Sequence, residues 1–166
     1  MTGRKTASVR DLHLGGQSQS IGVRGPLRIL VASAEDVSAI KKIADDHRTD
    51  CGFIPKAAFL EAVDKGWLLV AKVHGVVAGF VRFRHRRDKT TTVYEIALAN
   101  HFKRQGIGTE LVFALTEHAR QRNQLEIFLK CPANLPANHF YSSLGFQLVR
   151  VDSGKRRDLN VWRFGL

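Results

Sequence analysis

Residues 102–109 read FKRQGIGT and connect a predicted strand to a predicted helix. The strand spans Thr91–Ala99, which is rich in β-branched and aromatic residues, and the helix begins at about Ile107, where apolar residues start to recur at helical spacing. The first turn of a helix leaves backbone N–H groups without partners and carries about half a positive charge. Because Gly106 and Gly108 have no side chains to block these N–H groups, the stretch predicts an anion site suited to a phosphate.

The surrounding residues narrow the kind of phosphate site. Lys103 and Arg104 add two cations beside the glycines. The sequence contains no G-x-x-x-x-G-K-[ST] motif, which excludes a nucleoside triphosphate P-loop. A dinucleotide-binding fingerprint is also excluded, because its third glycine would fall on Leu111.

The glycine spacing resembles the [Arg/Gln]-x-x-Gly-x-[Gly/Ala] element of the GNAT superfamily of acyl-CoA-dependent N-acyltransferases, with Lys103 where Arg or Gln is usual. A second block, Asn134–Tyr141 (NLPANHFY), is followed by Leu144–Phe146 (LGF) and is similar to the family's N-x-x-A-x-x-F-Y…G-F element. It follows the apolar run Leu125–Leu129, which predicts another strand. Both blocks occur in the family's order and each follows a predicted strand, which argues against a chance match. The resemblance covers the chain from about Leu27 to Phe164.

We expect residues 1–26 to form a flexible tail and residues 27–166 to form one α/β domain. A spacing of capping-box type, Ser33 to Asp36, marks the start of a first helix that ends near His47. The element order predicts a single mixed sheet with helices on both faces, and the resemblance implies that its central strands splay apart. The remaining predicted elements are strands Leu27–Val31, Trp67–Val73, Val76–Arg84, Phe146–Val151 and Leu159–Phe164, a helix from Pro55 to Gly66, and a short helix carrying Tyr141.

The resemblance implies an acetyl-CoA-dependent N-acetyltransferase in which a primary amine attacks the thioester directly. An amine with a pKa near 10.4 is neutral in about one of ~2,500 molecules at pH 7, so a base near the thioester is useful. Glu95 is the only acid of the central strand, and alternation is expected to place it on the same face as Val93 and Ala97. Glu95 resembles the strand glutamate that serves as base in some family members; the alternative is a structural ion pair, for example with Arg82.

The same resemblance implies roles for further residues. The backbone N–H of Leu98 is expected to stabilise the oxyanion, and Tyr141 to protonate the leaving thiolate; the alternative for Tyr141 is packing against Phe140 and Phe146. Asn134 matches the position that hydrogen-bonds the pantetheine arm; the alternative is that it only caps the end of the preceding strand. The residues expected to bind acetyl-CoA are Leu98, Lys103, Arg104, Gln105, Gly106, Ile107, Gly108, Thr109, Asn134, Ala137 and Tyr141.

The acceptor is expected to contact the first two helices and their connection, as in the family. Asp45, Asp46, Asp50 and Phe53 are the candidates, although each is also explained as a solvated charge or a packed aromatic ring. The acceptor itself is left open as a small molecule, a peptide or an RNA-borne amine, because a fold does not determine a substrate. The oligomeric state is equally open.

The charge balance bears on the partner. The chain has 26 Lys and Arg against 15 Asp and Glu, a formal net charge of +11. The densest cationic segment is Arg82–Lys89, here called the basic hairpin, in which alternation sends Phe83 to one face and Arg82, Arg84 and Arg86 to the other. Aromatic residues for base stacking are sparse there, with Phe83 alone. A solvated surface is therefore favoured, with two alternatives: an enzyme acting on a nucleic-acid-borne amine such as aminoacyl-tRNA, or a non-catalytic GNAT-like module that binds nucleic acid.

Other features are expected to carry no chemistry. The two cysteines, Cys51 and Cys131, have no Cys-x-x-Cys spacing or clustered histidines, so we expect neither a disulfide nor a metal site. No apolar run approaches the ~20 residues that span a bilayer. The N-terminal segment has no apolar core typical of a secretory signal. We therefore expect a basic, cytoplasmic enzyme without a membrane partner.

Overall fold

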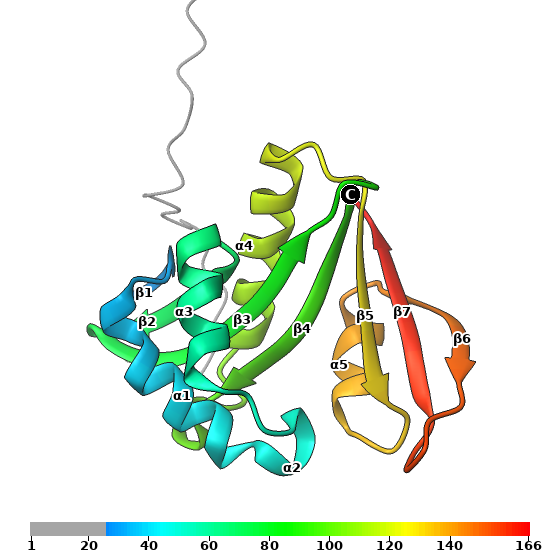
Figure 1. Ribbon diagram of the computed structural model, residues 1–166, viewed down its shortest axis with the longest axis horizontal. Helices are drawn as coiled ribbons and strands as arrows, with labels where there is room; N and C mark the ends of the chain where they lie inside the picture. Colours follow the sequence, from blue (N-terminus) through cyan, green and yellow to red (C-terminus); the bar gives the residue numbers. More distant parts are fainter. Residues whose placement is uncertain (1–25) are drawn as a thin grey trace, which may run out of the picture.

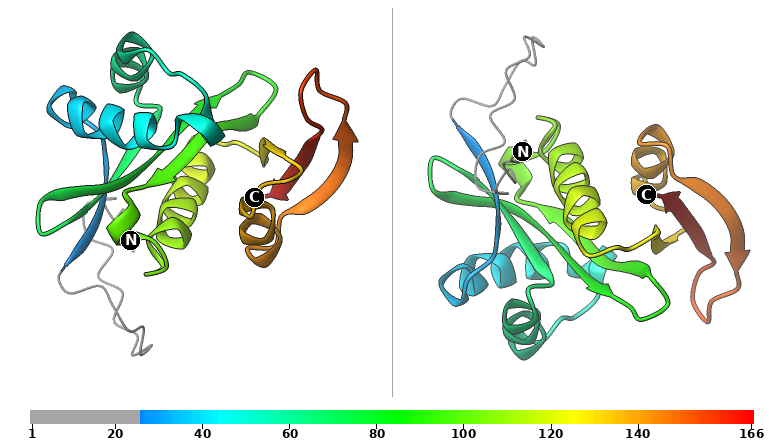
Figure 2. Two further views of the ribbon diagram at one scale, coloured as in Figure 1. Left: turned by 90° about the horizontal axis from the view of Figure 1, so that it is seen from below. Right: turned by 90° about the horizontal axis from the view of Figure 1, so that it is seen from above.

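The computed structural model describes residues 26–166, so the predicted tail lies outside the described residues apart from Pro26. Seven strands form one sheet in the order β1-β2-β3-β4-β5-β7-β6, with β4 and β5 parallel and every other neighbouring pair antiparallel. Helices α1 and α3 lie on one side of the sheet and α4 on the other (Figures 1 and 2). The strands are β1 (Leu27–Val31), β2 (Leu68–Val73), β3 (Val76–His85), β4 (Thr90–Leu98), β5 (Glu126–Pro132), β6 (Gln147–Asp152) and β7 (Leu159–Gly165). The helices are η1 (Ala34–Asp36), α1 (Val37–Asp46), α2 (Arg48–Cys51), α3 (Lys56–Lys65), η2 (Asn100–Phe102), α4 (Ile107–Gln121) and α5 (Ala137–Ser143).

This arrangement confirms the predicted mixed sheet with helices on both faces.

The Asp36 carboxylate accepts hydrogen bonds from the N–H of Ser33 (3.0 Å) and from its hydroxyl (3.2 Å), as the capping-box spacing predicts. The first helical region is more divided than expected, because η1 precedes α1 and the short α2 follows it. No helix within residues 26–166 is long and apolar enough to cross a membrane.

Two hydrophobic cores lie on opposite faces of the sheet. The α1/α3-side core packs α1 and α3 on the central strands, and the α4-side core packs α4 and α5 on the other face. Residues of the α1/α3-side core include Val37, Ile40, Ile43, Phe59, Leu68, Val70, Phe80 and Ala97. Residues of the α4-side core include Val81, Phe83, Val93, Ile107, Leu111, Leu115, Ile127, Leu129, Tyr141, Phe146 and Trp162.

The parallel strands β4 and β5 stay paired over only four positions. Their register runs from Thr90 opposite Glu126 to Val93 opposite Leu129. Beyond these residues β4 pairs only with β3, and β5 only with β7, so the two strands diverge toward their C-terminal ends (Figure 1). The predicted splay of the central sheet is therefore present, and it opens toward the start of α4.

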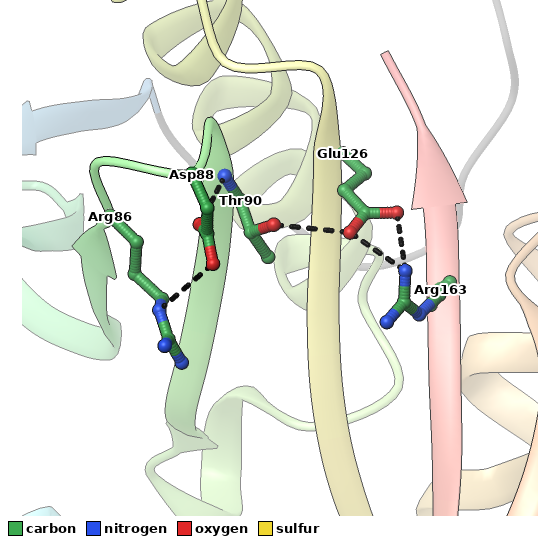
Figure 3. Close-up of polar contacts among 5 residues, drawn as sticks. All are labelled: Arg86, Asp88, Thr90, Glu126 and Arg163. Atoms are coloured by element: carbon green, nitrogen blue, oxygen red, sulfur yellow. Dashed lines mark hydrogen bonds and ion pairs between the residues drawn. The ribbon is translucent and has the colours of Figure 1, made fainter.

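A polar network holds the paired end of this fork. The Thr90 hydroxyl donates a hydrogen bond to Glu126 (3.1 Å), and Arg163 of β7 donates to both oxygens of the same carboxylate (2.9 and 3.0 Å) (Figure 3). Asp88 in the β3–β4 turn accepts from the N–H of Thr90 (3.1 Å) and lies 3.5 Å from the Arg86 Nε atom. Glu126 thus joins three strands where the fork is closed.

A β-bulge interrupts β4 just beyond the last pair with β5. Arg82 lies opposite Glu95, whereas Phe83 lies opposite Val93, so Tyr94 is an extra residue without a partner of its own. The bulge turns Tyr94 and Glu95 to the same face of the sheet. Both contact Arg82 there: its guanidinium carbon lies 4.9 Å from the Tyr94 ring centroid, and its Nε lies 2.7 Å from a Glu95 oxygen.

The bulge changes which residues of β4 share a face with Glu95. Strict alternation put Val93, Glu95 and Ala97 on one face. Ala97 does belong to the α1/α3-side core, on the face that Glu95 shares. Val93 belongs instead to the α4-side core, because the extra residue reverses the alternation between Val93 and Glu95.

A histidine pair lies between β3 and α4. His85 Nε2 is 3.0 Å from His118 Nδ1, and His85 Nδ1 is 2.8 Å from the Thr91 hydroxyl. The two imidazole rings stack with their centroids 5.1 Å apart. Burial lowers the pKa of His85 to about 4, with further contributions from His118 and Arg122. Burial and the same arginine also lower the pKa of His118.

This pair predicts a loss of stability in mild acid. Well above pH 6.5 both histidines are neutral in the folded and unfolded chains. As pH falls from 6.5 toward 4, the unfolded chain binds protons that the folded chain resists, so the free energy of unfolding decreases. Urea unfolding followed at stepwise lower pH measures the slope, which we expect to be shallower in a His85→Gln/His118→Gln double variant. An equal slope in the two proteins would assign the acid sensitivity to other groups.

Candidate active site

The loop before α4 presents backbone N–H groups that lack protein acceptors. Arg104 and Gly106 both have left-handed backbones, with φ of 63° and 80°. Within residues 26–166, the N–H groups of Ile107, Gly108 and Thr109 donate no hydrogen bond. These groups form the first turn of α4, where the helix dipole favours an anion. The left-handed conformation of Arg104 costs about 1–2 kcal/mol in a non-glycine residue, so the loop stores strain where the sequence predicts phosphate binding.

The two glycines have different surroundings. A Cβ atom on Gly106 would meet nothing within 4 Å, so this position is open as predicted, and its positive φ independently favours glycine. A Cβ atom on Gly108 would lie 3.3 Å from the Phe140 ring of α5 and 3.8 Å from Leu98. The missing side chain of Gly108 therefore lets α5 approach the start of α4, a packing role that the sequence did not reveal.

The other predicted loop residues are distributed around this turn. Lys103 and Arg104 are exposed, and neither forms an ion pair with any described residue. Gln105 donates from Nε2 to the carbonyl of His101 (3.0 Å), which braces the loop. Thr109 is half-buried in the first turn of α4. Two cations thus remain available beside the unpaired N–H groups.

The backbone of Leu98 faces the open side of the fork. Ala99 donates its N–H to Ala78 of β3 (2.8 Å), and alternate residues of an antiparallel strand point to opposite edges. The N–H and C=O of Leu98 therefore point toward β5, beyond the end of the β4–β5 ladder. His47, which follows α1, donates from Nε2 to the Leu98 carbonyl (2.7 Å). This histidine was not anticipated from the sequence, because only the fold brings it to β4.

Tyr141 projects from α5 into the α4-side core. Its ring packs against Phe140 and Phe146, as the packing alternative predicted, and also against Trp162. Its hydroxyl forms no hydrogen bond within the described chain. Burial raises the pKa of Tyr141 above its ordinary value, with smaller contributions from Cys131 and Cys51. The phenol is therefore a neutral, unpaired O–H group close to thiols from β5 and α2.

Glu95 forms a bidentate ion pair with Arg82. Arg82 donates from Nε and Nη2 to the two carboxylate oxygens, at 2.7 and 2.8 Å. The two side chains are mostly buried, with 11% of Glu95 and 19% of Arg82 exposed. The ion pair with Arg82, which the sequence suggested as the structural alternative for Glu95, is therefore present. Each carboxylate oxygen keeps a further lone pair that could accept from water or an amine.

Asn138 organises the loop between β5 and α5. Its Nδ2 group donates to the carbonyls of Pro132 and Leu135 (both 2.8 Å), and its Oδ1 accepts from Asn160 (3.0 Å) and from the Trp162 indole (2.9 Å). The loop so held carries the predicted pantetheine ligand Asn134, which is exposed, and Ala137, the half-buried first residue of α5. The sequence motif pointed to Asn134 and missed Asn138, whose partners come from distant β7.

We expect Asn138→Ala to lower the free energy of unfolding by about 1–3 kcal/mol, because it leaves the buried Trp162 N–H and the Asn160 amide without their acceptor, while the Pro132 and Leu135 carbonyls keep backbone donors. Urea unfolding measures this loss. Asn134→Ala in the same loop is the matched control, and its stability should stay near that of the parent. Equal stability of the two variants would show that the Asn138 bonds are replaced by water at no cost.

The acceptor candidates occupy mixed positions. Asp45 and Asp46 pair with Lys41 and Lys42 along α1, as solvated charges do. Phe53 is 62% exposed. Asp50 lies on α2, and it adds a small contribution to the pKa of both cysteines, which burial raises. Both cysteines are free thiols. Across residues 26–166, no group of three or more His, Cys, Asp or Glu side chains is arranged to hold a metal ion.

Comparison with known sequences places these features in a family. A sequence model of the acetyltransferase (GNAT) family matches residues 35–146, which include both the α4 loop and α5. The chain is also 31% identical over 122 residues to the 5-NmdU N-acetyltransferase of Pseudomonas phage PaMx11. That match covers 71% of this chain and 81% of the phage protein.

Solved structures agree with this assignment at the level of the fold. Ard1 from Thermoplasma volcanium superposes with a TM-score of 0.76 at 20% identity, covering 84% of this chain and 97% of Ard1. The yncA protein of Salmonella typhimurium, solved with its cofactor acetyl-CoA, superposes with a TM-score of 0.73 at 20% identity, covering 86% and 95% of the two chains. The chain belongs to the acetyltransferase (GNAT) family and is an N-acetyltransferase.

Proposed function

We propose that this enzyme transfers the acetyl group of acetyl-CoA to a primary amine by direct attack of the amine on the thioester. The observation that supports this most strongly is the fork between β4 and β5, which ends beside the unpaired N–H groups of α4. A similarly folded protein, yncA, was solved with acetyl-CoA as its cofactor. The acetyl-CoA thioester would supply the activated acyl group.

The residues present fit a coenzyme with a diphosphate. The open space at Gly106 and the free N–H groups of Ile107, Gly108 and Thr109 would receive the phosphates, and Lys103 and Arg104 would add positive charge. Asn134 and Ala137, on the loop held by Asn138, would contact the pantetheine arm, with Tyr141 at its thiol end.

Proton transfers are assigned to the side chains at the fork. Glu95 accepts a proton from the attacking amine, directly or through water, and the Leu98 N–H donates to the oxyanion. Arg82 positions the Glu95 carboxylate through its two hydrogen bonds. In this proposal Glu95 is the base and Arg82 holds its carboxylate in one orientation, which places the carboxylate for proton transfer.

The proton for the leaving thiolate is assigned to Tyr141. With ordinary pKa values of about 10 for tyrosine and 8.5 for a thiol, this transfer is uphill by about 2 kcal/mol. Burial raises the pKa of Tyr141 further, which alone would make the transfer worse. Burial also raises the pKa of the neighbouring Cys51 and Cys131 thiols, each to about 11. Burial would raise the pKa of the coenzyme thiol in the same way, so its thiolate would be a stronger base. This offsets the raised pKa of Tyr141.

Tyr141→Phe should lower turnover about 100-fold, at the lower end of the usual effect of a catalytic acid, because the leaving thiolate loses its proton donor. Acetyl-CoA affinity and stability should hardly change, since the hydroxyl makes no protein hydrogen bond and the ring is kept. Thiol release and thermal unfolding measure the two effects. Unchanged turnover would remove Tyr141 from the chemistry and leave it as a packing residue.

A nucleic-acid-borne amine is the acceptor class with a specific observation in its favour. The phage relative is named for 5-NmdU, in which dU is the usual abbreviation of deoxyuridine. The net charge of +11 favours approach to a polyanion. We therefore assign an amine attached to a nucleotide as the leading acceptor, ahead of a free polyamine or a peptide N-terminus.

The decisive experiment combines binding with a panel of acceptors. Calorimetric titration with acetyl-CoA should give one site per chain. Thiol release is then measured with a deoxyuridine that carries a primary amine on its base, free and within an oligonucleotide, with aminoacyl-tRNA, with a peptide and with a polyamine. Fastest release with a nucleotide amine supports the assignment, and fastest release with a peptide or polyamine overturns the acceptor class. Absence of acetyl-CoA binding would overturn the transferase proposal itself.

A further inference from the structure

Three arginine–aromatic pairs lie on one face of the sheet. The Arg84 guanidinium lies 5.4 Å from the Trp67 ring centroid, and the Arg163 guanidinium lies 5.6 Å from the Phe128 centroid. Arg82 and Tyr94 form the third pair, at 4.9 Å. Together the pairs draw on the segment before β2 and on strands β3, β4, β5 and β7. We call this set the arginine–aromatic face.

Strand alternation explains why the strand residues among these side chains share one face, whereas Trp67, which precedes β2, contacts both cores. Their neighbours Phe83, Val93, Leu129 and Trp162 all belong to the α4-side core, so the arginine–aromatic face points the other way. It therefore lies on the side of α1 and α3. Figures 1 and 2 show that these helices cover β2 and β3 and leave β5 and β7 uncovered on this side.

The face is partly open to solvent. Tyr94 is 47% exposed, and 44% of the Arg163 side chain is exposed. A hollow of about 150 Å³ lies between this face and α3, lined by Trp67, Arg82, Arg84 and Tyr94 together with Ala58 and Glu61. The rings of Trp67 and Tyr94 come from outside the basic hairpin, within which the sequence has Phe83 alone. Phe83, the aromatic residue seen in the sequence, is buried on the opposite face.

The charges beside the face are unevenly balanced. Arg82 is neutralised by Glu95, and Arg163 by Glu126. Arg84, Arg87 and Lys89, by contrast, form no ion pair with any residue of the described chain. They lie along the end of β3 and the turn into β4. The surface thus combines accessible rings with unpaired cations.

We infer that the arginine–aromatic face is a docking surface for single-stranded nucleic acid. Bases stack on Tyr94 and Trp67, and phosphates meet Arg84 and Arg87. An acidic peptide would use the cations but leave the rings without partners, and a duplex keeps its base faces stacked inside the helix. The aromatic rings therefore select single strands.

This inference rests on the proposed transfer to a nucleic-acid-borne amine. Tyr94 and Glu95 are consecutive residues turned to the same face by the bulge in β4. A base stacked on Tyr94 would therefore hold its amine substituent near the carboxylate assigned as base. The bulge in β4 therefore places a residue of the docking surface, Tyr94, next to the carboxylate assigned as base, Glu95.

Fluorescence anisotropy with a labelled single-stranded oligonucleotide tests the inference. Tyr94→Leu should weaken binding about 10-fold or more, whereas Tyr94→Phe should bind like the parent, because stacking needs the ring and not the hydroxyl. Arg84→Gln should also weaken binding and should reduce the slope of log affinity against log salt by about 0.7. The matched controls are Phe113→Ala, an exposed aromatic residue on α4, and Arg28→Ala, an exposed cation on β1; neither should matter.

Each other outcome has a definite meaning. Duplex binding as tight as single-strand binding, with no effect of Tyr94→Leu, would overturn the stacking surface. Displacement by polyglutamate as effective as by an oligonucleotide would favour an acidic protein partner and overturn it too. If the oligonucleotide does not bind while acetyl-CoA binding and acetylation of a small amine persist, the docking surface fails and the transferase stands. Oligonucleotide binding without any acetyl-CoA binding would instead remove the proposed function on which the inference rests.

Discussion

Glu95→Gln is expected to lower turnover by about 10²- to 10⁴-fold, because an amide cannot take the proton that the attacking amine must lose. Acetyl-CoA affinity should stay close to that of the parent, since Glu95 faces the α1/α3 side and lies away from the α4 loop. The pH–rate profile should also change, with loss of the limb that reports deprotonation of the base. Steady-state kinetics across pH and calorimetry measure these effects.

The ion pair with Arg82 provides the control. Arg82→Gln removes the same two hydrogen bonds and leaves the carboxylate in place. If Glu95 is the base, Arg82→Gln retains much more activity than Glu95→Gln and displaces the pH–rate profile without removing a limb. If the ion pair only supports the fold, both variants lose activity and stability to the same degree. An unchanged pH–rate profile in Glu95→Gln would exclude this residue as the base.

Gly108→Glu is expected to weaken acetyl-CoA binding by more than about 100-fold. The new carboxylate would lie in the first turn of α4, where it would occupy the helix dipole site and repel a diphosphate. Its stem would also press on the Phe140 ring, 3.3 Å from the position of the new Cβ atom. Calorimetric titration measures the affinity.

Gly108→Ala separates these two causes. It introduces the same contact with Phe140, which the ring can relieve by moving a few tenths of an ångström, and adds no charge. We expect the alanine variant to fold and to bind acetyl-CoA more tightly than the glutamate variant, with thermal unfolding as the check on folding. A folded Gly108→Glu protein that binds like the parent would place the coenzyme elsewhere.

Much of the fold could be predicted because its signals are local. The glycines at 106 and 108 mark the start of α4 at Ile107, where the structure has it. Pro55 and Gly66 bracket α3 as its N-cap and left-handed C-cap. The turn at His74 and Gly75 joins β2 to β3 as expected. In each case the conformational preference of one or two residues determines where an element begins or ends.

The features missed in the candidate site depend on residues distant in sequence. The bulge at Tyr94 exists only in relation to β3, so strict alternation misplaced Val93 relative to Glu95. The bonds of Asn138 reach Asn160 and Trp162 of β7. His47 meets Leu98, 51 positions further along the chain. No local pattern reports such pairings, because they arise when the sheet and helices pack.

The early end of the β4–β5 ladder has a thermodynamic consequence. Two strands inside one domain keep unpaired backbone edges facing each other, a condition that proteins usually avoid at their outer surfaces. A coenzyme bound along these edges stabilises the folded state by mass action, by about 2.7 kcal/mol at a concentration a hundredfold above its dissociation constant. If acetyl-CoA binds there as proposed, resistance of this enzyme to proteolysis and heat would rise with the supply of its acyl donor, so depletion of acetyl-CoA would shorten its lifetime as well as slow its catalysis.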